Sequence, residues 1–188
     1  MGRTALIVTD MLNPYEHDDA DKLVESVEQA LPNVVALRER AVEAGVPVIY
    51  VNDNHEDWES SRDALIETAL EGARPDLVQP ILPGDDDLFL AKTRHSIFYS
   101  TPVEHILGQE DIDHIVLTGQ VTEQCILYSA LDAYIRHIDM TVPRDAVAHI
   151  FDDLAEASLT MMERNMHAEV CEAADCRLGS GTKIAHRG

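Results

Sequence analysis

The sequence is poor in cysteine, and its three cysteines form no Cys-X-X-Cys pair. An odd number of cysteines without framework spacing excludes a disulfide scaffold and is typical of a reducing compartment. No apolar run is as long as a membrane span, and the N-terminus has no segment typical of a secretory signal. These absences predict a cytoplasmic protein.

Positive charge is also scarce: 14 Lys and Arg stand against 35 Asp and Glu, a formal net charge of −21 over 188 residues. Such a charge repels phosphate backbones and anionic lipid headgroups, so nucleic acid and membranes are excluded as partners. We therefore expect a small-molecule substrate. The hydrophobic share of 45% is too high for a disordered acidic chain and predicts one globular domain over residues 1–188.

Short apolar blocks alternate with amphipathic stretches, a pattern typical of a parallel sheet covered by helices. Helical spacing is clearest at 21–44, where Pro32 is expected to break or kink the helix, and at 123–137 and 152–166. The least regular stretch, 53–87, is expected to form a lid or pocket wall. This pattern predicts a three-layer α/β/α, Rossmann-like fold with a mostly parallel sheet of six strands, at Ala5–Thr9, Pro47–Asn52, Leu88–Ala91, His114–Thr118, Met140–Pro143 and Glu169–Cys171.

Polar residues that follow the strands are the candidates for chemistry, because ligands of open α/β sheets bind beyond the carboxyl ends of the strands. Cys125 follows a strand, Gly119 and the start of a helix, where backbone N–H groups favour a thiolate. Such a cysteine is a nucleophile or, equally well on position alone, a small buried apolar residue. We assign the latter role to Cys171 and Cys176.

Two charged residues end other predicted strands. Asp10 follows the first strand, where a carboxylate can take a thiol proton or simply form a turn. Lys92 ends the third strand, where an ammonium group can lower the pKa of a thiol or simply be solvated. Each signal is weak alone, but an acid, a cation and a thiol at the ends of three strands favour a catalytic site.

The order of these residues resembles that of the isochorismatase-like cysteine hydrolases. The resemblance rests on an Asp after the first strand, on KTRHSIF starting at Lys92, and on a G-x-x-T-x-x-C element formed by Gly119, Thr122 and Cys125. It covers almost the whole chain. The family includes nicotinamidases, carbamoylsarcosine-type amidohydrolases and hydrolases of ureido compounds.

The resemblance implies a Cys-Asp-Lys triad that cleaves a C–N bond of a small amide or ureide. Cys125 would attack the carbonyl carbon and form a thioester, Asp10 would move protons, and Lys92 would hold the charge pattern. It further implies a cis peptide bond between Gln120 and Val121, with the N–H groups of Val121 and Cys125 as an oxyanion hole. Relatives assemble as homodimers or homotetramers, and we expect the same here.

The subfamily is less clear from the residues. Asp53-Asn54-His55 matches part of the metal site of nicotinamidases, but the further histidine is absent, so we expect no metal and no cofactor. Family members that act on the isochorismate vinyl ether lack the cysteine, and its presence favours amide chemistry. The alternatives are a nicotinamidase with a metal at Asp53 and His55, an isochorismatase-type hydrolase, and a non-catalytic interaction module. By position, the substrate would contact Asn13, Trp58 and Phe98.

Overall fold

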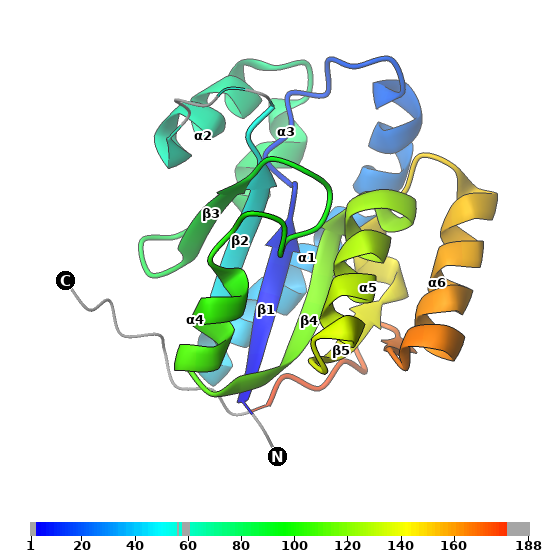
Figure 1. Cartoon of the computed structure of the whole chain (residues 1–188). Helices are drawn as coiled ribbons and strands as arrows, with labels where there is room; N and C mark the ends of the chain where they lie inside the picture. Colours follow the sequence, from blue (N-terminus) through cyan, green and yellow to red (C-terminus); the bar gives the residue numbers. More distant parts are fainter. Residues whose placement is uncertain (1–2, 56, 58–60, 180–188) are drawn as a thin grey trace.

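The chain folds around an open sheet in which every pair of neighbouring strands is parallel (Figure 1). The computed structural model describes residues 3–55, 57 and 61–179. The order along the sheet is β3-β2-β1-β4-β5-β7, and β6 pairs with β4 beside this path. The strands are β1 Arg3–Thr9, β2 Val48–Asp53, β3 Leu88–Lys92, β4 Ile112–Gln120, β5 Asp139–Pro143, β6 Val147–Ala148 and β7 Glu169–Cys171.

The predicted α/β class and mostly parallel sheet are confirmed, and all six predicted strands are present. The predicted number of strands is wrong by one, because β6 adds a seventh. It contributes two residues, which pair with Gly119 and Gln120 at the end of β4. A strand of two residues is too short to show any periodicity, so its pairing depends on the tertiary structure alone.

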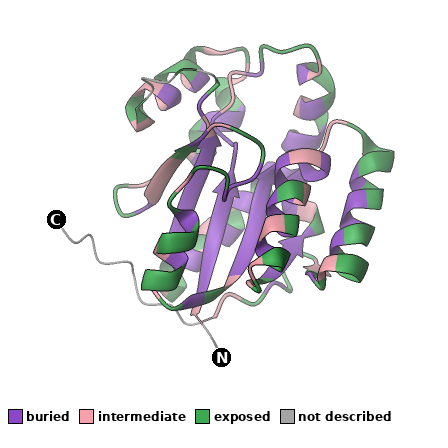
Figure 2. Cartoon of the chain, in the orientation of Figure 1, coloured by how far each residue is buried: buried purple, intermediate pink, exposed green. Residues whose placement is uncertain are grey.

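Helices cover both faces of the sheet, as predicted for three layers. The side chains of β1 alternate between the two faces: Leu6 and Val8 belong to the core cluster beneath α1, while Ala5 and Ile7 belong to the cluster beneath α4, α5 and α6. Figure 2 shows the central strands buried between these layers. The helices are α1 Ala20–Ala44, α2 Arg62–Glu71, α3 Pro75–Val78, α4 Val103–Gln109, α5 Leu127–Ile135 and α6 Asp152–Met166.

Helix α1 runs without interruption through Pro32, so the predicted break at this proline is wrong. Pro32 lies on the exposed side of the helix. On the opposite side, a buried stripe that includes Val27 and Val34 packs onto the sheet on both sides of the proline. The burial of this stripe compensates for the hydrogen bond that proline cannot donate. Gly45, in the left-handed conformation, ends the helix.

The stretch 53–87 is more regular than its sequence suggests, since it contains α2 and α3. Ser61 caps α2 by accepting a hydrogen bond from the backbone N–H of Ala64. Gly72 lies directly against the backbone of Pro14, where a Cβ atom would come within 2.4 Å of the proline oxygen. The segment therefore packs on the loop that follows β1, above the carboxyl ends of the strands (Figure 1).

The parallel strands place their carboxyl ends along one edge of the sheet, and the residues predicted to carry chemistry lie there. The amino end of β1, at Arg3, lies at the opposite edge in Figure 1. Among the described residues, none of the helices combines the length and the apolar character that a membrane span requires.

Candidate active site

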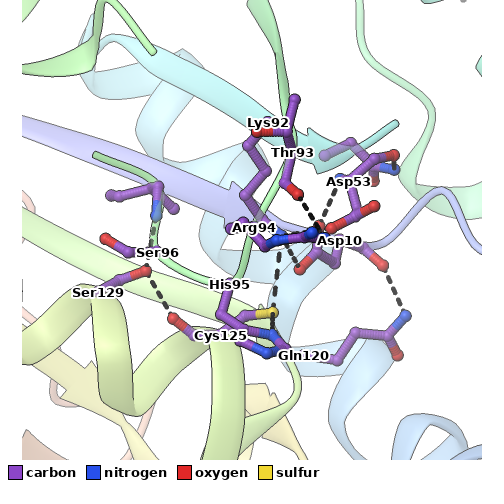
Figure 3. A network of polar contacts seen from close by, with 12 residues as sticks. Asp10, Asp53, Lys92, Thr93, Arg94, His95, Ser96, Gln120, Cys125 and Ser129 are labelled. Atoms are coloured by element: carbon purple, nitrogen blue, oxygen red, sulfur yellow. Dashed lines mark hydrogen bonds and ion pairs between the residues drawn. The ribbon is translucent and has the colours of Figure 1, made fainter. Parts of the chain in front are cut away.

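The centre of the site is the buried ammonium group of Lys92, whose side chain is 0% exposed. Its Nζ atom lies 2.9 Å from Oδ2 of Asp10 and 3.3 Å from Oδ2 of Asp53. A lysine is rarely buried unless its charge is paired, and here two carboxylates supply the pairing. Figure 3 shows these side chains converging from separate strands.

The sheet register explains this convergence. Asp53, the last residue of β2, is the register partner of Lys92, the last residue of β3. Asp10 follows β1 in the left-handed conformation, with a φ of 54°, and its N–H group bonds to the oxygen of Val51 in β2. The carboxylate is held from the other side, because Oδ1 accepts a 2.6 Å hydrogen bond from the N–H group of Asp53.

Cys125 completes the cluster from β4. It lies in a π-helical turn, Thr122–Ile126, that connects the strand to α5. Its Sγ atom is 3.6 Å from Nζ of Lys92, and the residue is 8% exposed. The structure thus brings together the three residues that the sequence singled out from three different strand ends.

Two hydrogen bonds of Ser129 anchor this turn from inside α5. The Ser129 hydroxyl donates to the carbonyl oxygen of Cys125 at 2.5 Å and accepts from the N–H group of Ile97 at 3.0 Å. Ser129 therefore ties the cysteine turn to the loop after β3. No sequence pattern had indicated this role for Ser129.

Burial and charge set the protonation states of the cluster. Burial raises the pKa of the Cys125 thiol well above its usual range, and the nearby Asp10 carboxylate raises it further, while Lys92 lowers it. Burial alone would lower the pKa of Lys92, but Asp10, Cys125 and Asp53 more than offset this and raise it. Burial therefore disfavours the thiolate form of Cys125, while the neighbouring negative charges favour the charged form of Lys92. Desolvation thus opposes the thiolate that the start of the helix and the lysine favour.

The backbone at the end of β4, just before Cys125, has an unusual conformation. The peptide bond between Gln120 and Val121 is cis. The side-chain amide of Gln120 donates to the backbone oxygen of Asp10, while its oxygen accepts a 3.5 Å hydrogen bond from the Tyr15 hydroxyl. Gln120 therefore links the cysteine turn to the loop that carries the aspartate.

Position 119 has no room for a side chain larger than that of glycine. Its φ is +106°, and a Cβ atom there would lie 2.1 Å from the backbone oxygen of Thr9 in β1. The backbones of β1 and β4 therefore approach closely just below the site. This approach brings Asp10 and Cys125 together.

His95 also reaches the cluster, with Nδ1 3.9 Å from Sγ of Cys125 (Figure 3). Its ring packs against Tyr128, with 5.3 Å between the ring centroids. In the sequence, His95 is part of the KTRHSIF segment that starts at Lys92. Its spacing of three residues from Lys92 was the one signal available.

The predicted substrate contacts have different surroundings. Asn13 accepts a 2.7 Å hydrogen bond from the N–H group of Tyr15 and shapes the loop after β1. Phe98 is buried in the core beneath α4 and α5, and the Arg136 guanidinium lies 4.9 Å from its ring centroid. Its described contacts are thus with the core rather than with Cys125. Trp58 lies outside the described residues.

The donors around Asp53 fit a metal ion poorly. Asp53 Oδ2 already contacts Lys92, and Nε2 of His55 lies 3.4 Å from the carbonyl oxygen of Leu12. A bound cation would also lie next to the lysine ammonium, where repulsion disfavours it. Within the described part of the chain, no group of three or more His, Cys, Asp or Glu side chains is arranged to hold a metal.

The isochorismatase domain model matches residues 4–175, and the chain therefore belongs to the isochorismatase family of hydrolases. An uncharacterized isochorismatase family protein of Bacillus subtilis is 34% identical over 166 residues, 88% of this chain and 92% of that protein. A probable inactive nicotinamidase of Arabidopsis thaliana is 28% identical, covering 85% of this chain and 88% of that protein.

Solved structures of the same fold include enzymes. A cysteine hydrolase from Pseudomonas syringae is 26% identical, with a TM-score of 0.74 over 92% of this chain and 90% of that one. N-carbamoylsarcosine amidase from Thermoplasma acidophilum is 26% identical, with a TM-score of 0.70 over 94% of this chain and 99% of that one. These relatives support a hydrolase with this α/β fold.

Proposed function

We propose that this protein hydrolyses a C–N bond of a small amide or ureide through a thioester on Cys125. The single observation that carries the proposal is the buried cluster of Cys125 Sγ, Lys92 Nζ and the Asp10 carboxylate. Burying three such groups together has a large desolvation cost, and clusters of this kind concentrate at catalytic sites.

In the first step, Asp10 takes the proton of the neutral thiol as Sγ attacks the carbonyl carbon. Burial raises the pKa of the Cys125 thiol, so a base beside the sulfur assists the loss of its proton during the attack. The S–C bond forms, the C–N bond breaks, and the leaving nitrogen takes the proton from Asp10. Lys92 remains charged throughout and compensates the negative charge that moves between aspartate and sulfur.

The developing oxyanion needs hydrogen-bond donors near Cys125. We assign this role to the backbone N–H groups of Val121 and Cys125, which belong to the cis peptide and to the π-helical turn. Losing one donor of this kind typically costs about 2.7–4 kcal/mol in the transition state. The turn is held by Ser129 and the strand end by Gln120, so the donors are fixed before substrate binds.

The test is a panel of small amides and ureides assayed for ammonia, with wild type and Cys125→Ala compared. Hydroxylamine added during turnover should yield a hydroxamate from the thioester. Intact mass spectra should show the acyl adduct on the protein, and peptide mapping should locate it on the peptide with Cys125. Cys171→Ala is the matched control, since it removes another thiol at a distance from the cluster. Turnover that survives Cys125→Ala would overturn the proposal.

Two relatives favour this reaction class over a binding module. N-carbamoylsarcosine amidase and the cysteine hydrolase share the fold at 26% identity. The relative named as a probable inactive nicotinamidase keeps the non-catalytic alternative in the test. Absence of ammonia from every compound, together with unreactive Cys125, would favour that alternative.

A cytoplasmic location and a homodimer or homotetramer remain predictions. Exposed apolar side chains on α5 and α6 include Ile135 at 60% and Leu154 at 50%. Sedimentation velocity at several protein concentrations tests the oligomeric state directly.

A further inference from the structure

The chain that leads into the Cys125 turn, residues 119–123, is joined to residues 147–151 on the far side of the sheet order. The two residues of β6 pair with the last two residues of β4. Directly after the strand, the hydroxyl of Thr122 donates to the carbonyl oxygen of Ala148 at 2.9 Å. The two segments are therefore in contact before the chain reaches the cysteine.

Glu123 makes the next contact between these segments, through a buried carboxylate. The residue is 8% exposed. Its Oε1 atom accepts hydrogen bonds from the N–H groups of Ile150 at 2.9 Å and Phe151 at 2.8 Å. Phe151 is the N-cap residue of α6 and supplies no side-chain cap, so the carboxylate lies at the end of the helix where negative charge is stabilised.

The second carboxylate oxygen of Glu123 indicates that helix capping is only part of its role. Oε2 is buried, and no donor among the described residues forms a hydrogen bond with it. A buried oxygen without a partner costs stability. An exposed serine or aspartate at the N-cap position would cap α6 without this cost. The position of Glu123 inside the cysteine turn points to a role in that turn.

The contacts of Glu123 fix the first part of the turn, which follows Val121. The N–H group of Val121, one of the two proposed oxyanion donors, lies between the β6 pairing and the contacts of Thr122 and Glu123. The sulfur end of the turn is held separately, because Ser129 binds the carbonyl oxygen of Cys125. Loss of Glu123 should therefore displace the oxyanion donor more than the sulfur.

We propose that Glu123 is a positioning residue that orients the N–H group of Val121 toward the developing oxyanion. The inference rests on the proposed function through the oxyanion hole assigned there. Glu123 touches no reacting atom and acts through the backbone. Its loss should slow reactions of Cys125 in which a carbonyl oxygen becomes negative, and should leave reactions that form no oxyanion unchanged.

Two reagents separate these reactions at the same sulfur. p-Nitrophenyl acetate acylates a thiol through a tetrahedral oxyanion, whereas iodoacetamide alkylates it by direct displacement. In Glu123→Ala, acylation of Cys125 should slow about 10–100-fold, since one oxyanion donor is worth about 10²–10³-fold and is here displaced rather than removed. Alkylation of Cys125 should stay within about twofold of wild type, because it depends on the thiolate and its access.

The controls come from the chain itself. Cys125→Ala gives the background release of p-nitrophenol, and Glu163→Ala removes an exposed glutamate of α6. Glu123→Gln keeps an oxygen that can accept both N–H groups and should acylate within about threefold of wild type. Glu123→Asp is shorter by one methylene and should be slow, so the Gln and Asp variants decide the matter if Glu123→Ala does not fold.

The outcomes distinguish this inference from the proposed function. Equal slowing of acylation and alkylation, or acylation at the wild-type rate in both Glu123→Ala and Glu123→Asp, would overturn the role of Glu123. Wild type that is acylated by the ester but releases ammonia from no amide or ureide would overturn the proposed function, while the acylation rates still decide the role of Glu123. Wild type whose Cys125 is not acylated at all would overturn both.

Discussion

Asp53 and Lys92 face each other at the ends of neighbouring parallel strands, with Oδ2 of the aspartate 3.3 Å from Nζ of the lysine. In the sequence, Asp53-Asn54-His55 matches only part of the metal site of nicotinamidases. In the structure, the carboxylate instead helps to hold a fully buried ammonium group. The same aspartate also donates its N–H group to Asp10, so it organises both charged members of the proposed triad.

This contact predicts that the hydrolase activity does not depend on a metal at Asp53. Because the carboxylate is committed to Lys92, treatment with a chelator followed by desalting should leave the rate of ammonia release unchanged. Added zinc should not increase it. A rate lost to the chelator and restored by zinc would contradict this prediction and favour the nicotinamidase alternative.

Replacing Lys92 by methionine should destabilise the fold and slow the reaction of Cys125. The change leaves two carboxylates without their buried cation, and breaking such a pair costs about 3–5 kcal/mol. We expect about 3 kcal/mol, because Asp53 is partly exposed to water. Urea unfolding measures this loss.

The matched control is Lys22→Met, which removes an exposed lysine 3.0 Å from Asp19. It should change the unfolding free energy by less than about 1 kcal/mol. Alkylation of Cys125 near neutral pH should slow in Lys92→Met only, because Lys92 lowers the pKa of the thiol. An unchanged alkylation profile would contradict the electrostatic role of this lysine.

Gly119→Ala should prevent the close approach of β1 and β4. The new methyl group would meet the Thr9 oxygen at 2.1 Å and force a φ of +106° on alanine, so we expect a loss of about 3 kcal/mol or more. Gly108→Ala is the control, since nothing lies within 4 Å of its Cβ position in α4. The Gly108→Ala protein should be more stable than wild type by about 0.5–1 kcal/mol. Thermal unfolding of both variants measures these changes in stability. Similar melting temperatures for the two variants would contradict the predicted steric clash at Gly119.

His114 should make the fold sensitive to mild acid. Burial lowers its pKa below the usual 6.5, and its ring nitrogens lie 3.2 Å from the Thr4 hydroxyl and 3.0 Å from that of Thr141. The unfolded chain therefore takes up the proton first as the pH falls. The stability contributed by neutral His114 is fully present above about pH 6.5, the pKa of the unfolded chain. It is lost as the pH falls from this value towards the lower pKa of His114 in the folded protein.

The measurement is the difference in melting temperature between about pH 7.5 and about pH 5.5. His114→Gln should show a smaller difference than wild type, because its side chain does not titrate. His105→Gln, at an exposed position, should behave as wild type. An equal difference in all three proteins would show that other groups cause the acid sensitivity.

Local patterns in the sequence predicted much of the fold. Continuous apolar blocks marked six of the seven strands, because strands covered on both faces need apolar residues on both sides. The same local patterns failed at Pro32, where packing of α1 on the sheet compensates for a missing hydrogen bond. They also failed at β6, which is two residues long.

The sequence by itself determined which chemical groups stand at the strand ends: an aspartate at position 10, a lysine at 92 and a cysteine at 125. Only the tertiary structure decided how they interact. Strand order brings these distant residues together, register pairs Asp53 with Lys92, and a loop carries His95 to the sulfur. Burial then raises the pKa of the thiol against the local effect of the turn. Periodicity is a property of neighbouring residues, whereas desolvation and charge pairing depend on distances between residues far apart in the chain.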